Sequence, residues 1–328
     1  MTHDQMRISV IVPTFNRSNM LRDCIESLLN QTLDPALYEV IIVDNNSKDA
    51  TRETVNEYLG LERYNVRYVL EPQQGLQFTR NTGAKSAHAA ILAYTDDDAV
   101  CDVRWLEALL RAYDDEEIGC AGGKIIVKWD EEPPAWVLPY SSLFGQLDET
   151  TLGSTFRVLQ PGEEVLIFGG NCSIRKSIFF ELGGFGMDQV GEVRAGDSET
   201  GLWIKAHKKG IKIAWVPDAI VWHMQIVSKN ATLSDVKRRF ANWGAGSTII
   251  SYKKIPRGGL RLLASAVRSF CTGVRYKAIV AVKSARGPPF DYQHELCSSY
   301  FLKKAQVKLD LAFSKRKRES VLRENWLE

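Results

Sequence analysis

Short apolar runs alternate with segments of helical spacing over the first hundred residues. The apolar runs are rich in β-branched residues and lie at 8–12, 40–43, 66–70 and 91–94. Apolar positions with helical spacing lie between them, at 19–29, 50–59 and 76–88. Runs that are apolar at nearly every position are typical of parallel strands buried on both faces. The alternation therefore predicts an α/β fold, in which a mostly parallel central sheet has helices on both faces.

Polar segments follow each of the four predicted strands, at 14–17, 44–47, 73–75 and 96–98. In sheets of this kind, ligands bind beyond the carboxyl ends of the strands. One shared site explains four consecutive polar strand ends better than four unrelated turns do. We therefore expect a binding site along this edge of the sheet.

The second half of the chain is less regular. We expect a helix at 198–209 and strands at 118–127, 211–216 and 219–222. The segment 128–161 is long, irregular and rich in proline, and such a segment inside a compact domain is usually functional. After Thr232 the pattern is helical to the end of the chain, with interruptions at Pro256 and 287–289.

Charge is distributed unevenly along the 328 residues, although the formal net charge is only +2. From Lys253 to Glu328 there are 17 basic and 6 acidic residues, a net charge of +11, which leaves 25 basic and 34 acidic residues for the rest. This asymmetry indicates two regions with different partners. We assign residues 1–252 to the α/β domain and residues 253–328 to a basic helical C-terminal region.

The sequence indicates neither export nor a membrane-spanning helix. Residues 1–7 lack the apolar core of a signal peptide, and no uncharged apolar run approaches the ~20 residues that span a bilayer. The six cysteines are scattered without a C-x-x-C pair, which argues against a zinc site or a disulfide framework. We therefore expect a protein of the reducing cytoplasm.

The acidic triplet Asp96-Asp97-Asp98 follows the fourth predicted strand. Adjacent carboxylates repel one another, so a cation among them makes the cluster easier to tolerate. Hard divalent cations such as Mg²⁺ and Mn²⁺ take oxygen ligands and often bridge to phosphate. The triplet thus indicates a metal–diphosphate site; the alternative is a solvated turn that caps a helix near Val103.

Six motifs in order resemble those of the family 2 glycosyltransferases. They lie between about Arg7 and Tyr252, at 12–17, 43–47, 75–83, 96–98, 169–171 and 196–199. The resemblance implies that residues 1–252 form a catalytic domain with the glycosyltransferase A-type (GT-A) fold, a Rossmann-like sandwich that binds nucleotide-diphosphate sugars. It also implies inverting transfer of the sugar to a saccharide or lipid-linked acceptor hydroxyl, in polysaccharide or glycolipid synthesis.

The resemblance implies that several strand-end residues bind the donor nucleotide. Asp44 would accept a hydrogen bond from an N–H of the base, because a buried carboxylate is a strong, directional acceptor; its alternative role is an Asx-turn. Pro13, Thr14 and Arg17 would form the lip of the nucleotide pocket, although Pro13 would also serve simply to end the strand. Arg80 would lie near the sugar nucleotide, or else pair with a surface carboxylate.

The resemblance also implies a divalent metal, Mn²⁺ or Mg²⁺, as cofactor. Alternate residues of an extended chain project the same way, so Asp96 and Asp98 would face one ion. Asp98 would be the direct ligand, and Asp96 would reach the ribose or a metal-bound water. His223, at the end of a predicted strand, would add an imidazole ligand that suits Mn²⁺ at least as well as Mg²⁺, although a lone histidine is often structural.

Asp197 matches the second acid of the family motif G-E-D-x-E, which implies a general base that deprotonates the acceptor hydroxyl. Gly196 stands where the motif has glutamate, so Glu199 stays an alternative base. A purely structural alternative is a helix start, with Asp197 as the cap and Glu199 in a first turn favoured by the helix dipole.

The sugar and acceptor would lie near a glycine-rich segment. Gly169, Gly170 and Asn171 resemble the family's stretch between the donor and acceptor sites, where small residues let the backbone approach a sugar. The resemblance also implies that Glu199 would help to bind the acceptor or sugar. Four aromatic residues would line an acceptor groove, or else pack in the core: Trp129, Trp136, Tyr140 and Trp203.

The basic C-terminal region predicts an amphipathic helix over 258–286. Its apolar stripe is Leu260, Leu263, Val267, Phe270 and Val274, and arginines recur beside it at 261, 268 and 275. Such a helix is typical of contact with an anionic membrane surface, here the inner face of the membrane. The alternative is packing on the catalytic domain or on a second subunit. No nucleic-acid motif accompanies the charge, so we expect no nucleic-acid partner.

Two other functions fit parts of the pattern. A sugar nucleotidyltransferase would need a glycine-rich, basic triphosphate loop after the first strand, and residues 12–17 do not supply one. A non-catalytic subunit that binds nucleotide sugars would accommodate Gly196 in the acidic motif. The donor sugar, the acceptor and the oligomeric state are not encoded in any motif of the sequence.

Overall fold

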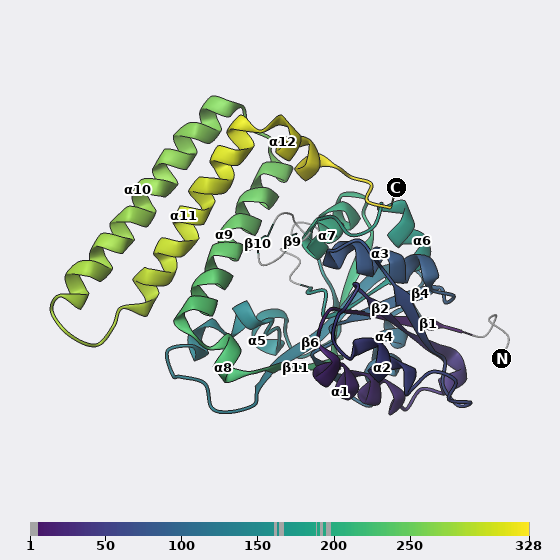
Figure 1. The fold of residues 1–328 in the computed structure, drawn as a ribbon. Helices are drawn as coiled ribbons and strands as arrows, with labels where there is room; N and C mark the ends of the chain where they lie inside the picture. Colours follow the sequence, from purple (N-terminus) through teal and green to yellow (C-terminus); the bar gives the residue numbers. More distant parts are fainter. Residues whose placement is uncertain are drawn as a thin grey trace.

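The structure is a computed structural model that describes residues 6–160, 163, 167–187, 189–190, 193–194 and 198–327. Strands and helices alternate through the first hundred residues in the predicted order (Figure 1). The strands are β1 (Ile8–Thr14), β2 (Tyr38–Asp44), β3 (Val66–Leu70) and β4 (Ile91–Thr95). The helices are α1 (Ser18–Leu29), α2 (Thr51–Asn56) and α3 (Leu76–Ser86).

Most of the described strands form one large mixed sheet in the order β3-β2-β1-β4-β8-β6-β11-β5, with β7 paired to β11; β9 (Gln189–Val190) and β10 (Val193–Arg194) form a separate two-stranded sheet. Strands β3, β2, β1 and β4 are parallel, and β6 and β11 are parallel to each other. The antiparallel strand β8 joins these two groups. The remaining strand bounds are β5 (Ala99–Cys101), β6 (Ile118–Trp129), β7 (Arg157–Val158), β8 (Asn171–Arg175) and β11 (Lys212–Gln225).

Two apolar cores cover the two faces of the sheet. Alternate residues of β1 point to opposite sides, as the strand period requires: Val10 and Val12 pack with α1 and α4 (Trp105–Ala112), and Ile11 packs on the side of α3. The second core also contains residues of α6 (Lys176–Glu181) and α7 (Ser198–Lys208). Burial on both faces explains why the strands are apolar at nearly every position.

One strand prediction was wrong. The runs at 211–216 and 219–222 belong to a single strand, β11, whose pairing with β6 is shifted between Val216 and Ile220. Pro217 lies in this irregular part of the strand and lacks the N–H that a regular ladder needs. The bulge lets β11 continue to the binding edge of the sheet, where it carries His223.

The C-terminal helices lie together beside the α/β domain (Figure 1). They are α9 (Leu233–Lys254), α10 (Gly259–Ser284), α11 (Tyr292–Phe313) and the short α12 (Lys315–Leu322). Helix α9 packs with α10 and α11 through Ala245 and Ile249, so the helical layer begins before the domain boundary that we assigned after Tyr252. None of the described helices combines the length and apolarity needed to cross a membrane.

The segment 128–161 is partly ordered by aromatic contacts with the helical layer. It contains a 3₁₀ segment (Leu138–Phe144), α5 (Glu149–Leu152) and β7. Trp136 stacks on Tyr292 with ring centroids 4.2 Å apart, and Tyr140 meets Phe240 edge-on at 5.3 Å. Trp203 is fully buried in the core, so its predicted place in an acceptor groove was wrong.

Candidate active site

Two strands bring acidic and imidazole side chains together at the carboxyl edge of the sheet. The acidic triplet follows β4, and the antiparallel pairing of β5 with β11 sets Ala99 opposite His223. The backbone N–H of Met224 donates to the carbonyl of Asp98 at 2.9 Å. Strand register therefore fixes His223 next to Asp98.

The side chains of Asp96, Asp98 and His223 form a group that could hold a metal ion. Each offers one ligand atom, and these three atoms lie within 4.8 Å of one another. The Nδ1 atom of His223 lies 2.6 Å from the carbonyl oxygen of Phe144, and Nε2 lies 3.1 Å from Asp98 Oδ1. Although burial opposes it, the hydrogen bond and charge of Asp98 raise the pKa of His223. If a cation takes the place of the Nε2 proton, Nδ1 can still donate to Phe144, which is the arrangement usual for metal-binding histidines.

The carboxylate of Asp98 fits a cation. Its Oδ1 atom is buried without a hydrogen-bond donor, apart from the ion pair that His223 makes when it is protonated. Burial alone would raise the pKa of Asp98, but the hydrogen bond and charge of His223, together with the charge of Arg17, outweigh it and lower that pKa. An ionised, buried carboxylate beside an imidazole is a donor set suited to Mn²⁺ or Mg²⁺.

Asp97 points away from the candidate ligands. Its carboxylate is buried, and it accepts hydrogen bonds from Thr14 Oγ1 at 2.8 Å and from Arg17 Nη1 at 3.0 Å. Burial, together with the charge of Asp98, raises its pKa, although Arg17 opposes the rise. This residue therefore ties the end of β1 to the acidic turn.

The predicted lip residues lie at the end of β1. Pro13 is still within the sheet, paired with Val43 of β2. Thr14 is buried against Asp97, and Arg17 contacts Asp97 and, at 2.6 Å, Asp98. Arg17 thus supplies positive charge directly to the acidic turn.

Asp44 lies at the end of β2 and is buried. Its Oδ1 accepts a hydrogen bond from the backbone N–H of Ser47 at 2.9 Å, and its Oδ2 accepts one from the Tyr68 hydroxyl at 2.7 Å. The first of these bonds reaches the third residue along the chain, one further than in the Asx-turn that was the alternative, and it holds the carboxylate against the turn after β2. Because an ionised carboxylate has about four lone-pair positions, the turn leaves Asp44 able to accept a further N–H.

Arg80 joins the acidic turn to α7. The side chain is only 4% exposed, with Nη2 3.3 Å from Asp96 Oδ1 and Nη1 3.6 Å from Glu199 Oε2. Arg80 therefore contacts two carboxylates at the predicted site, those of Asp96 and Glu199. Its guanidinium also lies over the ring of Phe185, 5.3 Å from the ring centroid.

Gly169 and Gly170 pack against these charged groups. A Cβ atom on Gly169 would lie 2.6 Å from Cζ of Arg80, and one on Gly170 would lie 2.7 Å from Oδ2 of Asp96. Both distances are far shorter than a van der Waals contact. The absence of side chains at these two positions therefore lets the backbone approach the charged edge.

Asn171 has a different environment from the two glycines. Its side chain is fully buried; the amide nitrogen donates to the carbonyls of Lys124 and Ala219, both at 2.8 Å, and the amide oxygen accepts from Trp105 Nε1 at 2.9 Å. These bonds join β8 to β6 and β11. The amide thus stabilises the sheet, which argues against direct contact between Asn171 and a sugar.

The predicted base Asp197 and the adjacent Gly196 lie outside the described residues. Glu199, in the first turn of α7, is described: its side chain is 14% exposed and it contacts Arg80. The alternative base therefore lies on the same side of the sheet edge as Asp96.

Sequence reasoning missed Arg239 of α9. Its guanidinium donates to the carbonyl of Leu143 at 3.2 Å and to Gln225 Oε1 at 3.4 Å, and its Nε is buried without a hydrogen-bond partner. Burial, together with the charge of Arg238, lowers its pKa to about 10. Since Arg239 follows two other basic residues on an ordinary helix, no local pattern distinguishes it.

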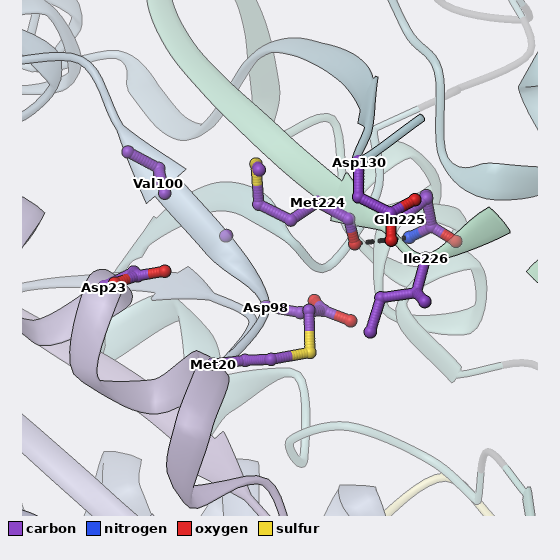
Figure 2. A pocket seen from close by; sticks show the side chains of 9 residues that line it. Met20, Asp23, Asp98, Val100, Asp130, Met224, Gln225 and Ile226 are labelled. Carbon is purple, nitrogen blue, oxygen red and sulfur yellow. Dashed lines mark hydrogen bonds between the residues drawn. The ribbon is translucent and has the colours of Figure 1, made fainter. Parts of the chain in front are cut away.

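A cavity of about 130 Å³ adjoins Asp98. Figure 2 shows Met20 of α1 and Met224 of β11 on its wall, with Asp98 between α1 and the end of β11. The other lining residues are Asp23, Ala99, Val100, Asp130, Gln225 and Ile226. The candidate metal ligand Asp98 therefore borders open space.

Comparison with known proteins gives a family match over the first half of the chain. A model described as "Glycosyl transferase family 2" matches residues 9–183. Glycosyltransferase AglE of Haloferax volcanii is 32% identical over 119 residues, which are 36% of this chain and 39% of that protein. The glucosyl-dolichyl phosphate glucuronosyltransferase of the same organism is 29% identical over 184 residues, 55% of this chain and 56% of that protein. The chain thus spans only part of the length of these relatives.

Solved structures share the fold. The mannosyltransferase PcManGT from Pyrobaculum calidifontis, in complex with GDP-Man and Mn²⁺, has a TM-score of 0.56 at 18% identity, and the match covers 92% of this chain and 86% of that one. S. aureus TarS 1-349, in complex with UDP, has a TM-score of 0.50 at 15% identity, covering 95% and 92%. At these identities the likeness concerns the fold alone, and it confirms the predicted GT-A architecture.

The mixed sheet with its acidic carboxyl edge has the GT-A fold. The family match extends over more than half of the 328 residues and includes the strand ends that carry Asp44 and Asp98. The chain therefore belongs to glycosyltransferase family 2, as its motifs predicted.

Proposed function

We propose that this chain transfers a sugar from a nucleotide-diphosphate sugar to an acceptor hydroxyl, with inversion at the anomeric carbon. The observation that carries the proposal is the group of Asp96, Asp98 and His223, whose ligand atoms lie within 4.8 Å of one another at the carboxyl edge of the sheet. We assign a divalent cation, Mn²⁺ or Mg²⁺, to Asp98 and His223. When bound, such a cation neutralises charge on the departing diphosphate.

We assign the donor nucleotide to the ends of β1 and β2. Asp44 accepts a hydrogen bond from the base, in addition to those from Ser47 and Tyr68. Pro13, Thr14 and Arg17 form the lip of the pocket, and Asp96 reaches the ribose or a metal-bound water. The proximity of Arg17 to the acidic turn supports this assignment, since its charge also attracts phosphate.

We assign the diphosphate and sugar to the space bounded by Arg80, Gly169 and Gly170. Arg80 holds Asp96 and Glu199 in fixed positions through its ion pairs. The two glycines leave room for the sugar beside these charges. Arg239, which donates to Gln225 next to His223, adds a buried positive charge that would stabilise negative charge developing on the leaving group.

We propose Asp197 as the general base that removes the acceptor proton, with Glu199 as the alternative. Support for Asp197 comes from its match to the family motif and from its position two residues before Glu199, which contacts Arg80. If Asp197 is the base, Glu199 instead helps to bind the acceptor or sugar through the same contact.

We propose a saccharide or lipid-linked acceptor, in glycolipid or polysaccharide synthesis on the cytoplasmic side of a membrane. The name of the second Haloferax volcanii relative includes a dolichyl phosphate, which supports a lipid-linked acceptor. Apolar residues of α10 are exposed, among them Leu260, Val267 and Phe270. Together with the arginines beside them, they support contact with an anionic membrane surface.

The test is turnover of a panel of nucleotide sugars with Mn²⁺ or Mg²⁺, measured as release of the nucleotide diphosphate. We expect Asp98→Asn to reduce turnover about 100-fold or more, the magnitude typical of losing one electrostatic stabiliser. The control is Asp114→Asn, which makes the same change at an exposed carboxylate. Wild-type turnover by the Asp98 variant would overturn the site assignment, and donor binding without turnover in the wild type would favour a non-catalytic subunit.

The base assignment has its own test. We expect Asp197→Asn to abolish transfer while donor binding persists, whereas Glu199→Gln mainly changes KM. The reverse pattern would assign the base to Glu199. The anomeric configuration of the product, determined by NMR, tests inversion.

A further inference from the structure

A second polar cavity, of about 90 Å³, lies between the C-terminal helices. We call it the helical pocket. It is lined mainly by hydroxyl groups and cations, contributed by α9, the α9–α10 connection, α10 and α11: Ser247, Thr248, Ser251, Tyr252, Arg257, Leu262, Ser265, Lys304 and Lys308. No acidic residue is among them, although the pocket contains three cationic side chains.

The cations of the helical pocket are not neutralised by protein. Among the described residues, no carboxylate lies within ion-pair distance of Arg257, Lys304 or Lys308. Within the part of the chain that the structure describes, Lys308 Nζ donates to the Ser269 hydroxyl at 2.8 Å and to the carbonyl of Ser265 at 3.2 Å, and Lys304 Nζ donates to the Tyr300 hydroxyl at 3.2 Å. Burial and the neighbouring cations, first Lys304 and then Arg257, lower the pKa of Lys308. Without a bound anion, the protein therefore keeps these like charges close together, and their mutual repulsion lowers its stability.

Other charges of the same helical layer form ion pairs. Glu295 of α11 is buried and pairs with Lys237 of α9 and Lys277 of α10. The partly exposed Asp310 pairs with Lys317 at 2.7 Å. In contrast, the cations of the helical pocket are left available to an anion from outside the chain.

The helical pocket is separate from the candidate active site. Ser247, the lining residue of α9 nearest to Arg239 in the sequence, lies eight residues further along the helix, which corresponds to roughly 12 Å at a rise of about 1.5 Å per residue. A diphosphate bound at Asp98 does not extend that far. The volume is also well below the roughly 300–1,000 Å³ of pockets that hold whole drug-sized ligands, so it suits a single compact group.

We propose that the helical pocket binds the phosphate group of an anionic ligand. Lysine and arginine donors with several hydroxyl groups are the side chains that form charge-assisted hydrogen bonds to phosphate oxygens. A free phosphate and the phosphomonoester headgroup of a lipid share this chemistry. The proposal does not depend on the proposed function, since no residue of the pocket belongs to the active site.

The first test titrates the whole chain with inorganic phosphate at constant ionic strength, with calorimetry and the melting temperature as readouts. We expect saturable binding that raises the melting temperature, and about tenfold or more weaker binding in Lys308→Met, which loses a charge-assisted bond. Arg257→Gln is a second variant, at an exposed residue whose change leaves the helix packing intact. Lys315→Gln, on α12, removes the same charge outside the pocket and should bind as the wild type.

The second test uses vesicles of phosphatidylcholine with and without phosphatidic acid. Loss of phosphatidic acid binding in Lys308→Met, but not in Lys315→Gln, would assign the pocket to a lipid phosphate. If Lys308→Met keeps vesicle binding but loses phosphate binding, the helical pocket would be assigned to a soluble anion. Absence of saturable phosphate and vesicle binding in the wild type, or equal losses in the Lys308 and Lys315 variants, would overturn the proposal, because net charge would then explain any binding.

Discussion

At the scale of single residues, the three adjacent aspartates lie in different environments. Asp96 contacts Arg80, Asp97 is buried and accepts a hydrogen bond from Thr14, and Asp98 faces His223. The three residues lie in a turn between β4 and β5, in which the Ala99 N–H donates to the Asp96 carbonyl at 3.2 Å. This turn, and not the extended chain that we expected, directs the first and third side chains to the candidate metal position.

We expect Gly169→Ala to weaken donor binding, because the new Cβ would lie 2.6 Å from Cζ of the buried Arg80. Arg80 would have to move, and its contacts with Asp96 and Glu199 would be lost or lengthened. Calorimetry with a nucleotide diphosphate should show affinity reduced about tenfold, as expected for one disturbed charge-assisted bond.

The matched control for that change is Gly258→Ala, where no atom lies within 4 Å of the new Cβ. Its nucleotide affinity should equal that of the wild type. Equal affinities for the Gly169 variant and the wild type would show that Arg80 adjusts freely, contrary to the rigid arrangement described here.

Long-range contacts between residues could not be predicted from the sequence. Arg17 and Arg80 were predicted near the nucleotide, but nothing in their neighbourhoods specified pairing with Asp98 or Asp96. Arg239 was missed entirely, since its position depends on how α9 packs beside Phe144. Local patterns determine which face or strand end a residue occupies, whereas these pairings depend on tertiary packing.

At the scale of elements, strand and helix identities followed from periodicity. The strands around β1 are buried on both faces and read as continuous apolar runs, which is why their ends located the site. β11 was divided wrongly because Pro217 is typical of a break, and a bulge inside a strand gives the same local signal. The helix predicted at 258–286 was confirmed as α10.

Helix α10 has one packed face and one exposed apolar face. Leu262, Ala266 and Gly273 face the other helices, whereas Val267 and Phe270 are more than half exposed. We expect the double variant Val267→Ser, Phe270→Ser to bind anionic vesicles at least about tenfold more weakly, since burying each such side chain is worth roughly 1.5–3 kcal/mol. Vesicle flotation measures the change.

The control for the α10 variant is Leu138→Ser, which removes an exposed apolar side chain from the α/β domain. Both proteins should keep the wild-type melting temperature, because the substituted residues are exposed. Undiminished flotation of the double variant would exclude this face of α10 as the membrane contact.

At the scale of the whole molecule, the acidic α/β domain and the basic helical region are joined at both ends of the helical layer. Arg239 and Phe240 of α9 contact the segment after β6. The chain end returns to the α/β domain, where the Trp326 N–H donates to the carbonyl of Gly183 at 2.8 Å. Figure 1 shows this return past α6. The two regions that charge distinguishes in the sequence are therefore in contact at both of these places.

The returning segment, which includes residues 326–327, also contacts α3, the helix that carries Arg80. The amide of Asn81 donates to the carbonyl of Trp326 at 3.3 Å, and Lys85 donates to that of Leu327 at 2.7 Å. We expect deletion of residues 323–328 to lower the free energy of unfolding by about 1–3 kcal/mol, the cost of leaving buried polar groups without partners. Nucleotide affinity should fall with it, since Asn81 adjoins Arg80.

Thermal unfolding and nucleotide calorimetry measure both effects of the deletion. Lys315→Gln, which alters an exposed charge on α12 and leaves the returning segment intact, serves as the control. An unchanged melting temperature and affinity in the truncated protein would contradict a coupling between the chain end and α3.

The central claim is that Asp98 and His223 hold a divalent cation next to the donor diphosphate. Its most direct test is Mn²⁺ binding, measured by electron paramagnetic resonance with and without a nucleotide diphosphate. We predict that the nucleotide strengthens Mn²⁺ binding, that Mn²⁺ strengthens nucleotide binding by the same factor, and that Asp98→Asn abolishes this coupling. Wild-type Mn²⁺ affinity and coupling in Asp98→Asn and in His223→Ala would contradict the claim.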